Sequence, residues 1–152
     1  MHTRSWQVAY RGLLPDSYLD ALDPDERAGR YTFADSGADR PRTTLAVEDG
    51  RICGFATVGP CRDPDKSTAG ELYAIYVHPD YWQVGVGRLL IQGAREELVH
   101  RGHAEGVLWV LVGNARAERF YDIDGWRPDG QRRLQEMQGI EVDEIRCARS
   151  LR

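Results

Sequence analysis

The stretch VHPDYWQVGVGRLL (residues 77–90) marks the point where a strand gives way to a helix. The run before it, ELYAIYV (residues 71–77), is apolar and rich in β-forming residues, which predicts a strand. After it, apolar residues recur four positions apart between Leu90 and Leu98, which predicts an amphipathic helix over about residues 86–101. A single glycine-containing loop therefore joins the two elements.

This glycine loop has the features of an anion site. A helix start leaves backbone N–H groups unpaired, and glycines let an anion approach the backbone closely. We therefore predict that the amides of residues 84–89 bind a phosphate, with Arg88 adding a positive charge. Alternatively, Gly85 and Gly87 only shape the connection. Leu90 stands where a dinucleotide fingerprint needs a small residue, and the sequence has no Gly-Lys-Ser/Thr, so both common nucleotide folds are disfavoured.

Turn signals and periodicity divide the rest of the chain. Helical spacing predicts two short helices near the N-terminus, and Asp49-Gly50 predicts a tight hairpin turn within residues 43–59. The run VLWVLV (residues 107–112) predicts a strand covered on both faces, as in a parallel or mixed sheet. Asn114 is expected to cap a short helix, and residues 139–151 are expected to form a final strand.

Composition favours one compact domain over residues 1–152. The net charge of -4 and the pI near 5.6 argue against a nucleic-acid partner. Three cysteines without a C-x-x-C pair indicate neither a disulfide framework nor a metal site. The sequence has no apolar run long enough for a membrane span and does not begin like a signal peptide, so we expect no membrane partner and a cytoplasmic location.

Two blocks, GELYAIYVHPDYWQVGVGRLL and VLWVLVGNARAERFYDIDGWRPDG, stand in an order and spacing that resemble the GNAT superfamily of N-acetyltransferases. The resemblance implies an α/β (α+β) fold, with a mixed, mostly antiparallel twisted sheet and helices on both faces. The family's usual first strand is short or missing here. The family's frequent dimers make a homodimer a plausible expectation.

By this resemblance the co-substrate is acetyl-CoA and no metal is needed. The glycine loop would bind the pyrophosphate through backbone amides, and Trp82 occupies a position where the family has Arg or Gln. The strand before the loop would pair with the pantetheine arm. The implied cofactor-binding residues are Ile75, Tyr76, Val77, Trp82, Gln83, Val84, Gly85, Val86, Gly87, Arg88, Asn114 and Tyr121.

Acetyl transfer to an amine needs a base for the ammonium proton, a donor for the departing thiolate and a group that stabilises the oxyanion. Glu71 is the candidate base, and a period of two places it on the strand face shared with Tyr73 and Ile75. Tyr121 resembles the family's general acid, and a backbone N–H near Ile75 or Tyr76 would meet the oxyanion. The alternatives are a solvated glutamate at Glu71 and a core aromatic at Tyr121.

The acceptor is expected to be a small-molecule or peptide amine. Trp6, Tyr10, Tyr18 and Tyr73 are candidates for its pocket, although aromatic residues at helical spacing are also typical of a core. The acidic residues between positions 16 and 26 suit a cationic acceptor or form a solvated face. Two further readings stay open, a non-catalytic acetyl-CoA-binding module and an unrelated phosphate-binding domain.

Overall fold

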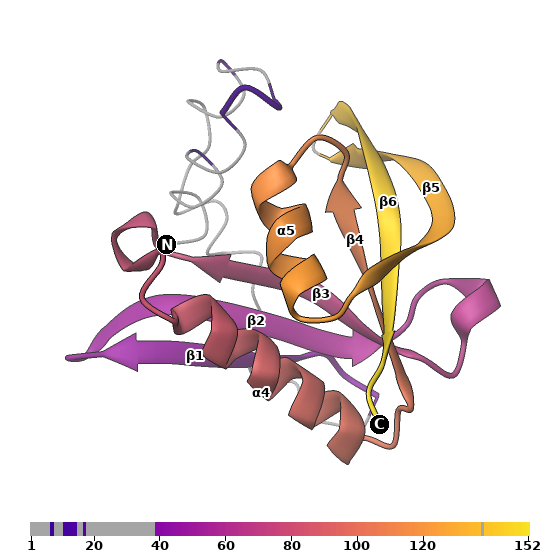
Figure 1. The fold of residues 1–152 in the computed structure, drawn as a ribbon, viewed down its shortest axis with the longest axis horizontal. Helices are drawn as coiled ribbons and strands as arrows, with labels where there is room; N and C mark the ends of the chain where they lie inside the picture. The colour runs from indigo at the N-terminus through magenta and orange to yellow at the C-terminus, as the bar shows by residue number, and fades with distance from the viewer. Residues whose placement is uncertain (1–6, 8–10, 15–16, 18–38, 138) are drawn as a thin grey trace.

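The computed structural model of the chain describes residues 7, 11–14, 17, 39–137 and 139–152, and the account below concerns these residues. They contain a six-stranded sheet in the order β1-β2-β3-β4-β6-β5 (Figure 1). The strands are β1 (Arg42–Glu48), β2 (Arg51–Pro60), β3 (Gly70–Val77), β4 (Glu105–Leu111), β5 (Arg127–Met137) and β6 (Ile140–Ser150). Only β3 and β4 pair in parallel, so the sheet is mixed and mostly antiparallel, as predicted.

The predicted hairpin is present as β1 and β2. Asp49 and Gly50 connect the two strands with φ angles of 49° and 77°, the left-handed values that a two-residue hairpin turn needs. The predicted strand at residues 71–77 is β3, and the one at residues 107–112 is β4. The final strand is β6.

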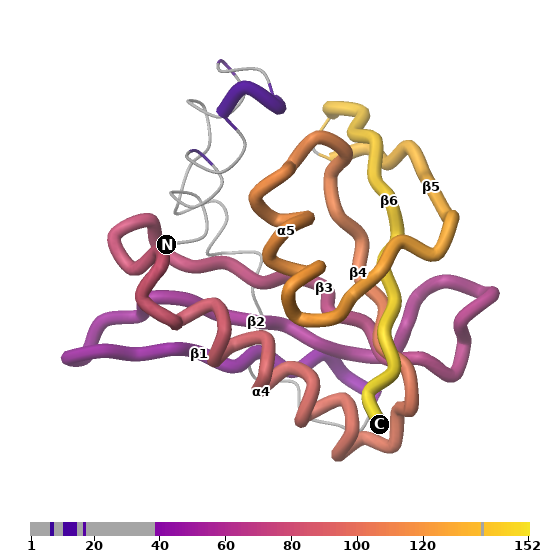
Figure 2. The backbone as a smooth tube through the Cα atoms, in the orientation of Figure 1, coloured from indigo at the N-terminus to yellow at the C-terminus, as the bar shows by residue number. Residues whose placement is uncertain are grey.

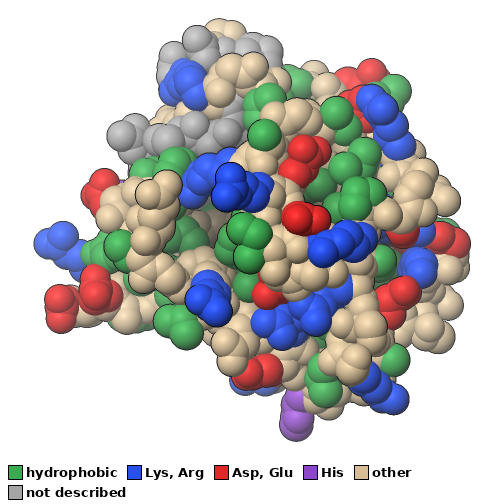
Figure 3. Space-filling model, in the orientation of Figure 1, with side chains coloured by type: hydrophobic (Ala, Val, Ile, Leu, Met, Phe, Trp, Pro, Cys, Tyr) green, Lys and Arg blue, Asp and Glu red, His purple; other side chains and the backbone are tan. Residues whose placement is uncertain are grey.

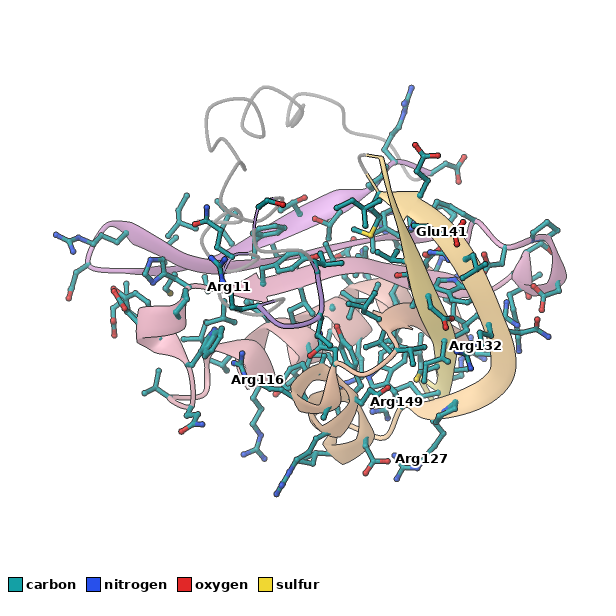
Figure 4. All side chains as sticks on the ribbon, turned by 90° about the horizontal axis from the view of Figure 1, so that it is seen from above. Arg11, Arg116, Arg127, Arg132, Glu141 and Arg149 are labelled. Atoms are coloured by element: carbon teal, nitrogen blue, oxygen red, sulfur yellow. The ribbon has the colours of Figure 1, made fainter. Side chains whose placement is uncertain are left out.

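Both helices of the described part lie on one side of the sheet, as the view in Figure 4 shows. They are α4 (Val86–His100), which follows the glycine loop, and α5 (Ala115–Ile123), which Asn114 caps by accepting a hydrogen bond from the N–H of Ala117. Two 3-10 turns, η1 (Pro64–Lys66) and η2 (Pro79–Tyr81), flank β3. Most of the two predicted N-terminal helices lies outside the described residues. Of the described positions there, Gln7 and Ser17 are helical, whereas residues 11–14 form a turn with a bridge between Arg11 and Leu14, so helices on the second face remain a prediction.

Each face of the sheet has its own apolar cluster. The larger core lies under the two helices and joins Leu90, Ile91, Ala94 and Leu98 of α4 to the inner faces of β2, β3 and β4. Trp126, 1% exposed, closes this core at the end of α5. The smaller cluster on the opposite face contains Leu14 and Val142, with Tyr76 and Leu111 packed against them.

Strand β5 was not predicted from the sequence. RPDGQRRLQEM is polar and mostly exposed, and it lies at the sheet edge, where no apolar alternation is required. The candidate pocket residues Trp6, Tyr10 and Tyr18 lie outside the described residues, as does most of the region where the family's first strand would stand.

Among the described residues, no helix has the length and apolar character needed to cross a membrane.

Candidate active site

The centre of the sheet is open because β3 and β4 separate. The two strands pair only from Gly70 with Gly106 to Leu72 with Leu108, and beyond these pairs each runs on without the other. Figure 1 shows them leaving a common point in different directions, and the tube in Figure 2 follows the same divergence. Beyond Leu72 and Leu108, the backbone edges that β3 and β4 turn toward each other therefore face a slot instead of a paired strand.

A cavity of about 630 Å³ occupies the slot and continues to the glycine loop. The cavity receives side chains from β3, β4, α5, β5 and β6. Of the residues predicted from the sequence, it is lined by Glu71, Tyr73, Ile75, Tyr76, Val77, Trp82, Gln83, Gly85, Gly87, Arg88, Asn114 and Tyr121. Val84 and Val86 are not among its lining residues, and Val84 is 69% exposed.

The glycine loop has the geometry that an anion site requires. Gln83 and Gly85 have φ angles of 63° and 93°, and Gly85 is the N-cap of α4. Within the described part of the chain, the N–H groups of residues 83–88 have no acceptor at normal hydrogen-bond geometry. The prediction of free amides at residues 84–89 was wrong for Leu89, whose N–H donates to the Gly85 carbonyl at 3.1 Å. Gly87 has a different reason to be glycine, because a Cβ there would lie 3.3 Å from the Phe120 ring. The loop thus presents free donors and the positive end of a helix dipole to the cavity.

Two arginines lie at this end of the cavity. Arg88 is exposed in the first turn of α4, as the sequence indicated. Arg116, at the start of α5 (Figure 4), lies with its guanidinium carbon 3.2 Å from the centre of the Trp82 ring. Figure 3 shows basic side chains around a hollow on the face that carries the helices. Arg116 was not predicted as a site residue, because its only signal in the sequence is its position two residues after Asn114.

Trp82 closes the end of β3. Its indole N–H donates to the carbonyl of Val77 at 2.8 Å, which fixes the ring beside the slot. The position that the family fills with Arg or Gln therefore holds an aromatic platform whose polar atom is used internally. Arg116 supplies a cationic group against this ring.

Hydrogen-bond alternation shows which backbone groups of β3 face the slot. His78 N–H donates to the carbonyl of Cys53, so the antiparallel ladder makes Phe55 and Tyr76 a bonded pair. The N–H and C=O groups of Ile75 and Val77 then point away from β2, toward the slot. Of the two predicted oxyanion donors, only Ile75 presents its N–H in the required direction.

A β-bulge in β3 corrects the predicted face of Glu71. The pairing with β2 shifts between Thr57 and Val58, so Tyr73 is an extra residue in β3. Leu72 and Ile75 consequently both pack into the core under the helices. Glu71 and Tyr73 lie on the opposite face, so the expectation that Glu71 shares a face with Ile75 was wrong.

Glu71 is buried and fully engaged. It is 1% exposed, which rules out the alternative of a solvated glutamate. Its Oε2 accepts hydrogen bonds from the backbone N–H of Arg62 at 3.0 Å and from the Arg62 side-chain Nε at 3.3 Å. Its Oε1 accepts a hydrogen bond from Nη2 of Arg62 at 2.8 Å. Arg62 also lies 4.1 Å from the Tyr73 ring centre, and the Tyr73 hydroxyl donates to the Pro60 carbonyl. The sequence analysis did not identify Arg62.

Tyr121 lies on α5 and lines the slot from the helix side. Burial, and to a lesser extent the charges that Tyr76 and Cys147 carry when ionised, raise the pKa of its phenol well above the ordinary value. The hydroxyl therefore stays protonated at neutral pH and remains available as a donor. Its ring also meets Phe120 edge-on, with centroids 5.5 Å apart, so it packs as a core aromatic and lines the cavity at once.

A buried arginine organises the other end of the cavity. Arg146 of β6, with a 3% exposed side chain, donates to three aspartates. These are Asp63 (3.1 Å), Asp65 (2.8 and 2.6 Å) and Asp129 (2.6 Å). Asp63 also accepts the indole N–H of Trp109 at 2.9 Å. Arg146 thereby joins β6, β5 and the loop after β2 around Trp109, which lines the cavity.

No group of three or more His, Cys, Asp or Glu side chains suited to a metal ion occurs in the part of the chain that the structure describes.

Comparisons with known proteins agree with this geometry. Residues 5–126 match the model of the acetyltransferase (GNAT) family. An uncharacterized N-acetyltransferase, YuaI, of Bacillus subtilis (strain 168) is 32% identical over 117 residues, 75% of this chain and 64% of that protein. The [ribosomal protein bS18]-alanine N-acetyltransferase of Escherichia coli (strain K12) is 32% identical over 95 residues, 62% of this chain and 61% of that protein.

The chain thus spans less than two thirds of the length of these two relatives. Among solved structures, that of YncA, a putative acetyltransferase from Salmonella typhimurium with its cofactor acetyl-CoA, has a TM-score of 0.62 and 21% identity. The match covers 90% of this chain and 73% of YncA. At that identity the likeness concerns the fold.

Proposed function

The chain belongs to the acetyltransferase (GNAT) family, and from this premise we propose that it transfers an acetyl group from acetyl-CoA to a primary amine. The observation that carries the proposal is the slot between β3 and β4, which opens onto a loop of unpaired backbone amides. A long ligand with a diphosphate at one end and a narrow arm at the other fits this arrangement.

The residues present fit acetyl-CoA, which supplies an acetyl group as a thioester. The amides of residues 83–88 would hold the diphosphate, with Arg88 and Arg116 adding charge. The slot-facing N–H and C=O groups of Ile75 would pair with the arm as an added strand does. Asn114 uses its side-chain oxygen to cap α5, and its amide NH2 is the group left to face the cavity.

Glu71 would accept the proton of the acceptor ammonium group, and Tyr121 would donate a proton to the leaving thiolate. An alkyl ammonium with a pKa near 10.4 must lose a proton, at a cost of about 4 to 5 kcal/mol at neutral pH. Glu71 would receive this proton through a water molecule, because Arg62 already bonds both of its oxygens. Tyr121, protonated at neutral pH, would donate a proton to the leaving sulfur.

A second candidate is an acetyl-CoA-binding module without turnover. The pairing of Glu71 with Arg62 favours it, because Arg62 already bonds both oxygens of the candidate base. The two candidates share the cofactor site and differ only in chemistry.

One experiment separates them. Acetyl-CoA should raise the melting temperature of the protein. At an acetyl-CoA concentration of a hundred times its Kd, the free energy of unfolding should increase by about 2.7 kcal/mol. Incubation with acetyl-CoA and a panel of amines should then release coenzyme A thiol. Stabilisation without thiol release across alkylamines, polyamines, aminoglycosides and peptide N-termini would favour the binding module. Absence of stabilisation would reject both candidates.

A further inference from the structure

Glu144 of β6 is a second carboxylate in the cavity, on the same sheet face as Glu71. Glu144 pairs with Leu111 of β4 and with Arg133 of β5, and the residues facing one another across a strand pair share a face. Leu111 belongs to the cluster opposite the helices, so Glu144 lies on that face too. Its side chain is 13% exposed and lines the cavity.

One oxygen of Glu144 has unused bonding capacity. Oε1 accepts Nε of Arg133 at 3.0 Å, whereas Oε2 has no hydrogen-bond donor within the described residues. Glu71 differs, because both of its oxygens are bonded to Arg62. A largely buried carboxylate oxygen without a donor is unfavourable unless water or a ligand supplies one. Glu144 is therefore the cavity carboxylate with room for a further N–H donor.

The charges around Glu144 favour a cation over an anion. Arg133 lies 4.0 Å from the Trp109 ring centre and 4.0 Å from Asp63, which itself bonds Arg146. Glu71 and Glu144 line the cavity with Arg62 and Arg133, and behind this lining three aspartates share Arg146, so the whole cluster has five carboxylates, three guanidinium groups and a net charge of -2. The carboxylates are Glu71, Glu144, Asp63, Asp65 and Asp129, and the guanidinium groups are Arg62, Arg133 and Arg146. An additional ammonium group reduces this excess, whereas an additional carboxylate increases it.

Glu144 lies well away from Glu71 along the cavity. Glu71 pairs with Val107 of β4, and Glu144 pairs with Leu111, four residues farther along that strand. Four residues of strand correspond to about 13 Å. Because a water molecule lies between Glu71 and the reacting amine in the proposed reaction, an acceptor that reaches both carboxylates carries its second ammonium group on the order of 10 Å from that amine.

We propose that Glu144 binds a second ammonium group of the acceptor, so that the acceptor is a long diamine or polyamine. This inference rests on the proposed function, because it names the acceptor class of that reaction. Hexamethylenediamine and spermidine, when extended, span a distance of the required order. Hexylamine has the same chain as the diamine and only one charge.

The matched pair hexamethylenediamine and hexylamine tests the proposal in the full chain. We expect the wild type to acetylate the diamine with a kcat/KM about tenfold or more above that of hexylamine, the gain typical of a hydrogen bond between charged groups. In Glu144→Gln the ratio should fall to about threefold or less. Asp143→Asn removes the same charge from the adjacent residue on the other face, which pairs with Arg132 outside the cavity, and should keep the ratio.

Controls make the outcomes distinct. Acetyl-CoA should stabilise all three proteins equally, which shows that each is folded. In the wild type, added salt should raise KM for the diamine more than for hexylamine, a result that does not depend on any variant. Equal kcat/KM for both amines, or a preference that survives Glu144→Gln, overturns this proposal and leaves the acetyltransferase proposal intact. If acetyl-CoA releases no coenzyme A thiol with hexylamine, hexamethylenediamine or spermidine as the acceptor, the result counts against both the diamine proposal and the acetyltransferase proposal.

Discussion

The guanidinium carbon of Arg116 lies over the Trp82 ring, 3.2 Å from its centre, at the end of the cavity that the glycine loop borders. Trp82 is itself fixed by the hydrogen bond to Val77, so the arginine rests on a rigid surface. A guanidinium held in this way is preorganised for a phosphate oxygen, because little side-chain entropy remains to be lost.

Arg116→Ala should therefore weaken acetyl-CoA binding. Loss of one charge-assisted contact of about 1.5 to 3 kcal/mol predicts a KM for acetyl-CoA raised roughly tenfold or more, with kcat little changed. Arg119→Ala is the matched control, since Arg119 is exposed on the same helix and does not line the cavity. An unchanged KM in Arg116→Ala would remove this residue from the cofactor site.

Gly85→Ala tests the conformation of the glycine loop. The φ angle of 93° at Gly85 costs an alanine about 1 to 2 kcal/mol, although the space around it is open. The strain should displace the loop amides and raise KM for acetyl-CoA, as steady-state kinetics will measure. Gly93→Ala, inside α4 and equally free of close neighbours, should instead stabilise the protein by about 0.5 to 1 kcal/mol.

Local signals predicted the elements around the slot. The hairpin, α4, β4 and α5 follow from turn residues, helical spacing and a helix cap, all of which act within a few residues. The bulge at Tyr73 left no such signal, because every residue near it in β3 is compatible with a regular strand. The face of Glu71 was therefore predicted only in part.

Long-range pairs explain what the sequence analysis missed at the site. Arg62 is separated from Glu71 by a loop, and Asp63 is 83 residues from Arg146. The strand that holds Arg146, IEVDEIRCARS, contains charged residues along its whole length, so nothing in it distinguished Arg146 as a buried arginine that needs partners. Which partners would meet it depended on the packing of the loop after β2, which periodicity does not specify.

Glu71→Gln tests the proposed base. The substitution keeps the shape and a hydrogen-bond acceptor for Arg62 but removes the proton acceptor. If Glu71 accepts the ammonium proton, kcat at neutral pH should fall by about a hundredfold or more, in line with general-base catalysis. Glu141→Gln, at an exposed residue of the final strand that is labelled in Figure 4, is the control. A kcat and pH–rate profile equal to wild type would remove Glu71 from the chemistry.

Tyr121→Phe tests the proposed acid. The loss of the hydroxyl should lower kcat by about a hundredfold or more while leaving acetyl-CoA binding in place. Because burial raises the pKa of Tyr121, the protonated donor persists as pH rises past the ordinary tyrosine value of about 10. The wild-type kcat should accordingly show no loss from tyrosine ionisation below that pH. Full turnover by Tyr121→Phe would leave Tyr121 as a packing residue.

Arg146 should matter most for stability. Arg146→Met leaves three aspartates without their shared partner, two of them mostly buried, and breaking such a network costs about 3 to 5 kcal/mol. Arg132→Met, at an exposed arginine paired with Asp143, should change stability much less, because water screens an exposed ion pair. Urea unfolding of both variants measures the difference. Equal stabilities would mean that the buried network contributes no more than a surface pair.

The same network sets an expected response to acid. Hydrogen bonds from Arg146 lower the pKa of Asp65 below its ordinary value, so the folded state binds this proton less readily than the unfolded chain. The contribution of Asp65 is therefore fully present above about pH 5 and is lost as pH falls through the ordinary aspartate range near 3.9 and below. Asp65→Asn removes this titration, so its melting temperature should decline less between pH 6 and about pH 3 than that of the wild type. Parallel declines in the two proteins would show that the pair of Asp65 with Arg146 makes no contribution to acid sensitivity, and that other carboxylates govern it.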